Sequence, residues 1–532
     1  MNLFSRSCWA SGCLSWAFAI AATTAAADEP PAVMFTVTVD RGADVGQGFG
    51  SLFEAASEDG ALVVGAGFQD GYNTQLRGDR HALRFFVRPT DGTRSFRVEE
   101  LPRPNDLTGT YLSGLDEVVR STHGGLKAWD PAAGAWRMEP DVGGTQEVMR
   151  LGDGLLEFGD GQVRFDGRTI LPPAERGKYQ LFYYANGYLC FYHVERGGRG
   201  YRPFEDDADG FSKLYACPWT PWEPRVDLAR ASVLTLPVVG EMTFAWGRIG
   251  DQVVTGSNIG GFYVLEEGRW RMLLEPNLTV SYQLYSTLPF HGRLLMGQYP
   301  TGRLFEYDGR SIVDLAGWPP VPPGVSPSAR EAQTTAVYGG ELLVGVWPWG
   351  ELWRQGPDSG RWEMIRRMFD HPPASDATVH PYEAESRDLP VANLWGQRIT
   401  SLVTSGDSLY VSTSAKSPSE WEPERYPFLA PDRWKSYGAV YRVTTPGHLG
   451  AATAWTDGPT TFELSIQGRR MTIAQDGERL ATADITGPLG DKLPGLARLK
   501  PVRWGDGLYG PFGGATLEGA VAADARASAA TP

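Results

Sequence analysis

Cysteine is scarce in this chain. Only four of its 532 residues are cysteines, and two of them, Cys8 and Cys13, fall in an N-terminal segment that we expect to be removed. Cys190 and Cys217 remain, and an even pair in an exported protein favours a disulfide, with two buried thiols as the alternative. No Cys/His spacing in the sequence predicts a structural zinc site.

Basic residues are outnumbered by acidic ones. Lys and Arg total 49 against 63 Asp and Glu, which gives a formal net charge of −14. Such a surface repels nucleic acid and anionic membranes on average, and no Lys/Arg-rich stretch interleaved with aromatic residues offsets this repulsion. We therefore expect no nucleic-acid partner. Net charge does not describe a cleft, so a local basic site for an acidic sugar stays open.

Long apolar runs are missing after the N-terminus. Residues 8–22 are mostly apolar, follow Arg6 and precede the small residues Ala25, Ala26 and Ala27. This pattern is typical of a cleavable signal peptide over residues 1–27. The alternative, a membrane anchor, needs roughly 20 apolar residues, and this run is shorter. We expect a secreted or periplasmic protein after cleavage, with no membrane insertion.

Glycine-rich loops of the kind that cradle phosphates are also absent, because the glycines stand in short turns between strands. The chain contains 65 Gly, 39 Pro and 12% aromatic residues, a composition that favours many short strands over helices. In residues 338–364, Leu342, Val344 and Val346 alternate with Leu343 and Gly345, and glycine turns separate three short segments. Alternation with period two between glycine breaks predicts antiparallel strands.

The same frame recurs along the chain in units of four short strands. The units span residues 50–101, 110–141, 146–172, 179–237, 242–275, 282–315, 333–368 and 399–444. Repeats of about 40–50 residues with four strands each predict a β-propeller. We therefore predict an all-β protein with a seven- or eight-bladed propeller over residues 28–450, in which residues 34–39 complete the last unit and close the ring.

The C-terminal region departs from the repeat. Residues 461–485 form a pattern of two or three strands with a hairpin turn at Asp476-Gly477, a pair favoured in such turns. Together with residues 504–518 they resemble the closing strands of a concanavalin-like jelly roll. The sequence predicts a small β appendage over residues 451–519, packed on the propeller, and a disordered alanine-rich tail over residues 520–532.

Several units carry an acidic residue, then glycine, then tryptophan in the turn before their last strand, as in Asp358-Ser359-Gly360-Arg361-Trp362. This turn resembles a degenerate Asp box, the turn motif of sialidase-like propellers, and the resemblance concerns fold and not activity. The leading Ser or Thr of the motif is absent. A sialidase would also need an arginine triad and a Tyr–Glu pair, and neither can be mapped on this sequence.

The loops between the second and third strands of each unit are expected to gather on one face, around the central channel. They hold amides, imidazoles and aromatic rings, a mixture that suits the C–H faces and hydroxyls of sugars, and residues 416–437 belong to this set. Structural wedges between blades are the alternative role for the aromatic residues. We predict a polysaccharide or other glycan as partner, with these substrate-binding residues: Asn73, Asn258, Gln298, Trp347 and Trp349.

His123 and His193 are the candidate acid–base groups, because imidazole exchanges protons near neutral pH. The alternative for each is a loop histidine bonded to a backbone carbonyl. Arg202 would neutralise a uronate carboxylate by a two-point contact, and Tyr299 would donate a proton. In fold and residue types this set is similar to that of propeller polysaccharide lyases, and the similarity implies β-elimination on a uronate.

Two other functions stay open. A hydrolase would use two facing carboxylates, for which Asp70, Glu331 and Glu383 lie in suitable loops. A non-catalytic scaffold would bind a protein partner on the same face.

The segment of residues 205–210 (EDDADG) looks like the first half of a calcium loop, with acids at alternate positions and then glycine. At the twelfth position, where an EF-hand has Glu, this chain has Ala216. A solvated acidic loop is therefore favoured over bound calcium. We predict no metal site and no cofactor, with calcium in this loop as the alternative.

Overall fold

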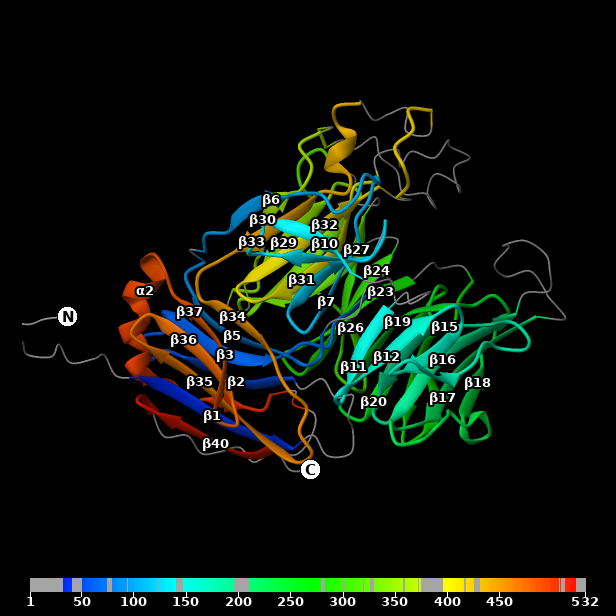
Figure 1. Ribbon diagram of the computed structural model, residues 1–532, viewed down its shortest axis with the longest axis horizontal. Helices are drawn as coiled ribbons and strands as arrows, with labels where there is room; N and C mark the ends of the chain where they lie inside the picture. Colours follow the sequence, from blue (N-terminus) through cyan, green and yellow to red (C-terminus); the bar gives the residue numbers. More distant parts are fainter. Residues whose placement is uncertain are drawn as a thin grey trace, which may run out of the picture.

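The protein consists of a β-propeller and a two-sheet β-sandwich (Figure 1), as seen in a computed structural model. The structure describes residues 32–40, 50–73, 79–92, 94–122, 124–139, 147–195, 210–278, 283–299, 302–318, 320–325, 330–356, 359–371, 373–374, 396–415, 418–424, 431–506, 508 and 512–522. Strands dominate these ranges, and the one α-helix in them, α2 (Pro488–Lys492), is a single short turn. In this part of the chain no helix is long and apolar enough to cross a bilayer.

The propeller has seven four-stranded blades within the described residues. The first strands of neighbouring blades contact one another from blade 3 through blade 7 and on to blade 1, so the first strands lie nearest the axis. In blades 1 to 4 the strands are β7 (Leu112–Leu115), β8 (Val118–Ser121), β9 (Lys127–Asp130), β10 (Ala135–Met138); β11 (Glu147–Leu151), β12 (Gly154–Gly159), β13 (Gln162–Phe165), β14 (Arg168–Leu171); β15 (Lys178–Ala185), β16 (Tyr188–Glu195), β17 (Phe211–Pro218), β18 (Ser232–Thr235); and β19 (Thr243–Ile249), β20 (Gln252–Ser257), β21 (Phe262–Glu266), β22 (Arg269–Leu274).

The remaining blades complete the ring. Blades 5 to 7 contain β23 (Gln283–Phe290), β24 (Arg293–Tyr299), β25 (Leu304–Tyr307), β26 (Ile312–Asp314); β27 (Glu331–Tyr338), β28 (Glu341–Trp347), β29 (Glu351–Gln355), β30 (Trp362–Arg367); and β31 (Arg398–Ser405), β32 (Ser408–Ser414), β33 (Val440–Thr444), β6 (Arg97–Leu101). Aromatic residues pack between blades, for example Trp318 against Trp353 and Trp362 with ring centroids 6.2 and 4.2 Å apart. The propeller class predicted from the repeats is confirmed, and units two to eight correspond to blades 1 to 7.

Closure of the ring differs from the prediction. The outer strand of blade 7 is β6, which pairs Leu101 with Val440 and Arg97 with Thr444. The strand predicted for this role, β1 (Val33–Asp40), lies instead in the sandwich. Its alternating buried residues belong to the sandwich core, so β1 was correctly predicted as a strand and assigned to the wrong sheet.

The sandwich combines both ends of the chain, and its blue and orange-to-red strands lie together at the left of Figure 1. Stacked rings of Phe35 and Phe53, with centroids 4.0 Å apart, join the two sheets at the core. One sheet has the order β37 (Glu478–Asp484), β36 (Arg470–Gln475), β35 (Pro459–Gln467), β1, β40 (Phe512–Glu518); the other has the order β34 (His448–Ala452), β5 (Ala82–Pro89), β3 (Leu62–Phe68), β2 (Ser51–Ala56), β39 (Arg503–Trp504).

Two predicted boundaries are therefore wrong. Residues 50–101 do not form a blade, because β2, β3 and β5 bury their apolar faces against β1 and β35 in the sandwich. The region over residues 451–519 is not a small appendage, because it supplies most of one sandwich sheet. The jelly-roll resemblance was carried by strands whose partners stand about 400 residues earlier, as in the pairing of Val37 with Phe462.

Candidate functional site

A loop of the sandwich enters the centre of the propeller. It leaves β3 at Gln69 and returns to β5 after His81, and we call its described residues, 69–73 and 79–81, the plug. Within the plug, β4 (Tyr72–Asn73) pairs with the first strand of blade 5, Asn73 opposite Ser286. The Tyr72 hydroxyl donates to the Phe244 carbonyl of blade 4 at 3.1 Å. The plug is thereby fixed inside the channel by backbone and side-chain hydrogen bonds.

A buried ionic group holds the plug in place. Arg80 Nε lies 2.6 Å from Asp70 Oδ1, and both side chains are at most 5% exposed. Tyr183 of blade 3 donates its hydroxyl to Asp70 at 3.2 Å, and Arg248 of blade 4 lies 3.9 Å from the same carboxylate. Burial, with the nearby Asp70 charge, raises the pKa of the Tyr183 phenol, so the phenol stays protonated and serves as a donor.

The plug carries Asn73 to one end of the channel. There a cavity of about 60 Å³ is lined by Asn73, Tyr111, Tyr285 and Arg398, with Gln333, Thr334, Ile399 and Thr400. Tyr285 contacts the ring of Tyr299 at 5.4 Å, and Arg398 lies 5.8 Å from the ring of Trp347. We call this region the channel mouth. The structure thus places three of the predicted residues, Asn73, Tyr299 and Trp347, in or next to one polar cavity.

The other predicted binding residues occupy structural positions. Asn258 is 5% exposed and accepts the Met242 amide through its side-chain oxygen at 2.9 Å. Gln298 and Trp349 are each 1% exposed. Arg367 covers the Trp349 ring at 5.1 Å and donates to the Trp349 carbonyl at 3.1 Å. Trp349 therefore has the structural role that was the alternative for the aromatic residues, and Asn258 and Gln298 are buried within the propeller as well.

His193 also occupies a packed position. Its Nε2 lies 2.8 Å from the Arg176 carbonyl, and its ring contacts Tyr179 and Phe211 at 4.6 and 4.7 Å. Burial lowers the pKa of this imidazole, so it is neutral at neutral pH. The bond to a backbone carbonyl expected under the alternative is confirmed, but the loop placement is wrong, because His193 lies within β16. His123 and Arg202 lie outside the described residues, so the catalytic set is not assembled in the part of the chain that is described.

The predicted disulfide is absent, because Cys190 and Cys217 are both free and buried. The strand register gives the reason: Cys190 stands opposite Ala216, and Cys217 stands opposite Leu189. Successive strand residues point to opposite faces, so the two thiols lie on different sides of the sheet. Burial raises the pKa of Cys217 to about 12.

No metal centre is found among the described residues, which contain no group of three or more His, Cys, Asp or Glu able to hold an ion. Most of the acidic segment considered for calcium, residues 205–209, lies outside them. Glu383 is outside them as well. Glu331 is fully buried and accepts a hydrogen bond from Gln333 at 2.9 Å.

An aromatic groove opens beside blades 7 and 1. Its volume is about 500 Å³, and it is lined by Trp421 and Trp434 together with Asn105, Asp106, Leu107, Gly124, Lys127 and Glu420. The two indole rings are nearly parallel, with an interplanar angle of 11° and centroids 6.1 Å apart. The guanidinium of Arg103 lies 4.6 Å from the Trp434 ring and anchors it.

The groove belongs to the predicted loop face, because Trp421 and Trp434 lie in the long insertion between β32 and β33. The sequence pointed to this loop and missed its individual tryptophans. Their signal was present: both stand in a stretch rich in proline and charge, without the alternation of the strands. In the structure both indoles are half-buried and pack against the core between blades 6 and 7.

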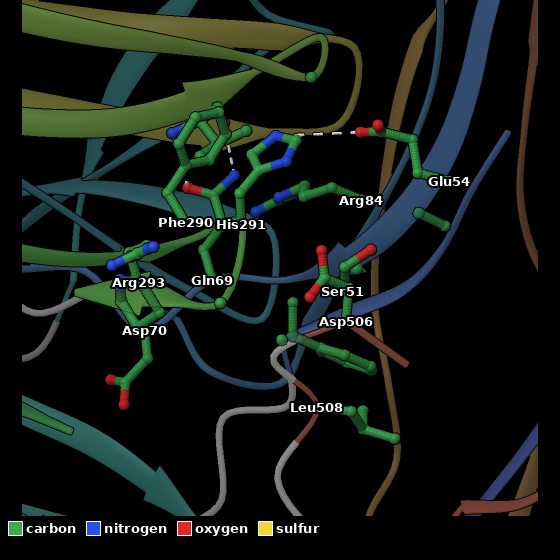
Figure 2. Close-up of a pocket in the computed structure, with 18 of the residues that line it drawn as sticks. Ser51, Glu54, Gln69, Asp70, Arg84, Phe290, His291, Arg293, Asp506 and Leu508 are labelled. Carbon is green, nitrogen blue, oxygen red and sulfur yellow. Dashed lines mark hydrogen bonds and ion pairs between the residues drawn. The ribbon is translucent and has the colours of Figure 1, made fainter. Parts of the chain in front are cut away.

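A separate cleft lies between the sandwich and the propeller (Figure 2). It has a volume of about 200 Å³ and is bounded by β2, β3 and β5 on one side and by the turns that end the first strands of blades 4, 5 and 6 on the other. Figure 2 shows the His291 ring directed at Glu54, and Nε2 lies 3.9 Å from that carboxylate. Arg503 forms an ion pair with the same carboxylate.

These features define a seven-bladed propeller whose channel is filled by a loop of an attached sandwich, with one groove on the loop face and one cleft between the two units. No protein-family model matches the chain, and no curated protein matches it.

Several solved structures are similar at low identity. The extracellular domain of the putative one-component system BT4673 from B. thetaiotaomicron is 13% identical with a TM-score of 0.37, and the match covers 60% of this chain and 40% of that one. YCF48 from Cyanidioschyzon merolae is 10% identical with a TM-score of 0.35, over 65% of this chain and 98% of that one. BamB from Moraxella catarrhalis is 11% identical with a TM-score of 0.29, over 72% and 99%. The propeller assignment rests on the strand order itself.

Proposed function

We propose that this protein is exported and binds an extracellular glycan on the loop face of its propeller. The observation that carries the proposal is the aromatic groove, in which two parallel indole rings stand beside amide and carboxylate side chains. Flat aromatic faces suit the C–H surfaces of sugar rings, and Asn105, Asp106 and Glu420 offer acceptors to sugar hydroxyls.

One segment of chain connects the groove to the channel mouth. Asn105, Asp106 and Leu107 line the groove, and Tyr111 lines the mouth. Four residues of extended chain reach at most about 14 Å, so Leu107 and Tyr111 are no farther apart than that. A short oligosaccharide therefore has the length to contact both places. In this arrangement the tryptophans hold the chain, and Asn73, Tyr111 and Arg398 contact its end.

The charge of the groove favours neutral or amino sugars over uronates. Two acidic residues, Asp106 and Glu420, line it against one basic residue, Lys127. The nearby Arg103 guanidinium is occupied by the Trp434 ring and by the Tyr437 carbonyl, 3.3 Å away. The Lys127 ammonium donates to the Pro104 carbonyl, which reduces what it can offer a ligand. An anionic sugar would meet like charge at the groove. Binding of a neutral glycan is therefore the favoured hypothesis, and β-elimination on a uronate by His123, His193, Arg202 and Tyr299 is the less favoured one.

The test is binding of purified protein to neutral, amino, uronate and sulfated oligosaccharides by isothermal titration calorimetry. We expect Trp421→Ala and Trp434→Ala each to weaken binding of the best ligand roughly tenfold or more, since buried aromatic anchors dominate such contacts. Trp222→Ala is the matched control, because Trp222 is an exposed tryptophan, 67% accessible, outside the groove.

Three outcomes would contradict the proposal or part of it. Binding that survives both groove substitutions would move the site elsewhere. No glycan bound across the panel would leave a scaffold for a protein partner as the better hypothesis. New reducing ends together with ultraviolet absorbance of an unsaturated uronide would establish a lyase and contradict the charge argument.

A further inference from the structure

We propose that the cleft between the sandwich and the propeller is a second binding site, which takes a single neutral sugar ring or a polyol of that size. The cleft lies at the opposite end of the channel from the channel mouth. Its lining includes Phe290 and Val337 near the ends of β23 and β27, whereas the mouth is lined by residues from the first halves of the same strands. The proposal is independent of glycan binding in the groove.

The size of the cleft limits what it can hold. Its volume of about 200 Å³ is below the roughly 300–1,000 Å³ of pockets for drug-sized molecules. Apolar walls are supplied by Phe86 and Pro289 with Phe290 and Leu508. A single ring with hydroxyl groups fits a cavity of this size with apolar walls and a few polar groups.

Asp506 and Ser51 provide unused hydrogen-bonding capacity. Their side chains lie side by side in the cleft (Figure 2), and the Ser51 amide donates to the Asp506 carbonyl at 3.2 Å, which fixes the two residues together. Within the described part of the chain, neither side chain forms a hydrogen bond or an ion pair. A carboxylate accepts several hydrogen bonds and a hydroxyl both donates and accepts, which is the pattern that vicinal sugar hydroxyls satisfy.

His291 stands on the opposite wall in an uncommon backbone conformation. Its φ of 51° and the φ of 71° at Gly292 form a two-residue turn between β23 and β24, a turn type in which Asn or Asp is the usual first residue. A Cβ on Gly292 would lie 3.2 Å from Asp506 Oδ1, so the turn and the carboxylate approach closely.

The protonation state of His291 suits a neutral ligand. Burial lowers the pKa of its imidazole, and the Glu54 carboxylate opposes that effect without cancelling it. The ring is therefore neutral at neutral pH, with one nitrogen that donates and one that accepts. Such a ring can donate a hydrogen bond to a sugar hydroxyl or accept one from it.

The charges of the cleft are balanced by the protein. Arg84 lies 2.6 Å from Glu117, and Arg293 lies 3.5 Å from Asp308. Glu54 is paired with Arg503, and Asp70 with Arg80. Arg248 also lines the cleft, 3.9 Å from Asp70, so these five basic groups equal the five acidic ones with Asp506 included, and no net positive charge is left for an anionic ligand such as a uronate. This is the reason for assigning a neutral ring.

The test uses the intact mature protein with glucose, galactose, mannose and glucuronate, followed by saturation-transfer NMR and calorimetric titration. We expect at least one neutral monosaccharide to bind, and glucuronate to bind more weakly than glucose. Asp506→Ala should weaken binding at least roughly tenfold, as expected for loss of a hydrogen bond to a charged group. Ser51→Ala, a smaller change at the same place, should weaken it in the same direction.

Glu478→Ala is the matched control, an exposed acidic residue of the sandwich on β37, and it should bind like wild type. The Trp421→Ala/Trp434→Ala double variant separates the two sites, because it should retain monosaccharide binding. The proposal is overturned if wild type binds no neutral monosaccharide at millimolar concentration, if Asp506→Ala and Ser51→Ala bind normally, if glucuronate binds more tightly than glucose, or if the double tryptophan variant loses the monosaccharide. Failure of glycan binding in the groove would leave each of these results unchanged.

Discussion

Gly340 lies where a turn of blade 6 touches the sandwich. Its φ is 73°, and a Cβ there would fall 2.5 Å from Phe86 Cζ on β5. We expect Gly340→Ala to destabilise the protein by about 1–2 kcal/mol for the left-handed backbone and by a further 1–3 kcal/mol for overpacking. The free energy of unfolding, measured in urea, checks this.

Gly187 is the matched control for that substitution. It occupies the same second position in the turn of blade 3, its φ is 78°, and nothing lies within 4 Å of an added Cβ. Gly187→Ala should therefore cost only the backbone part, about 1–2 kcal/mol. An equal loss of unfolding free energy in the two variants would show that close packing of Gly340 on Phe86 does not contribute to stability.

For single residues, the sequence predicted the chemical type that a position needs better than it predicted where the side chain lies in the fold. Cys190 and Cys217 do lie in neighbouring strands, but a disulfide depends on register, and an offset of one residue sends a side chain to the other face. Asn258 was recognised as a polar residue in a loop, and its bond to the Met242 amide has no signature in the sequence. The local pattern predicts that a segment is a strand. Which of its side chains are exposed depends on residues from elsewhere in the chain that pack against it.

At the scale of the elements, the position of the plug depends on the Asp70 carboxylate. Asp70 accepts from Tyr183 and Arg80 inside the propeller. Asp70→Ala should destabilise the protein by about 3–5 kcal/mol, because it leaves the buried Arg80 guanidinium without its counter-charge. In the exposed pair of Arg470 and Asp484, with side chains 65% and 62% accessible, Asp484→Ala should cost about 0–1 kcal/mol. Chemical denaturation of both variants measures the difference, and similar losses would mean that the plug is not an anchor.

The other end of the plug should respond to pH. Burial, followed by the nearby Glu117 charge, raises the pKa of Asp79 to about 6. The folded state then holds this proton more tightly than the unfolded state, whose Asp has an ordinary pKa of about 3.9. The stabilisation is fully present below that ordinary value and is lost as the pH rises through about 6, by at most about 3 kcal/mol.

The measurement is the free energy of unfolding from pH 4 to pH 7 for wild type and for Asp79→Asn. Asp79 also accepts the amides of His81 and Asp116 at 3.0 and 2.7 Å, so the substitution shifts the absolute stability, and the slope is the informative quantity. The difference between the two proteins should change across pH 4–6 and be constant above it. Parallel curves over the whole range would contradict the raised pKa.

At the scale of the elements, the sequence predicted well which consecutive strands form hairpins, and predicted poorly which distant strands pair with them. Seven of the eight units are blades, because each blade is made of consecutive strands and its pattern is local. The first unit has the same alternation, but β2 and β3 pair with β39 and β5 in a sandwich sheet. Asn73 was placed near the channel through that wrong blade and reaches it through the plug instead, a route set by the packing of two units.

In the whole molecule, the sandwich and the propeller are interlocked along the chain. The sandwich takes β1, β2, β3 and β5 from before the propeller and its other strands from after it, and β6 leaves the sandwich region to close blade 7. A boundary near residue 450 therefore cuts through the sandwich. Composition and repeats could not show this, because a strand pattern does not reveal which strand 400 residues away completes its sheet.

Removal of the C-terminal strands should consequently also destabilise the N-terminal strands of the sandwich. A chain ending at residue 446 loses β34 to β37 together with β39 and β40, and Phe35, Phe53 and Phe85 lose the core partners Phe462 and Leu464. Each large apolar side chain left exposed costs roughly 1.5–3 kcal/mol, and domains are stable by only about 5–15 kcal/mol. We expect this chain to be insoluble, or soluble without cooperative thermal unfolding by circular dichroism.

A chain ending at residue 522 is the control, because it keeps every described strand of the sandwich. It should be as soluble as the full chain and unfold with the same midpoint. If the shorter chain were also soluble and cooperative, the N-terminal strands would be able to form a core without residues 448–522. The sandwich would then be a separable addition to the propeller, and the plug alone would account for the attachment of its first half.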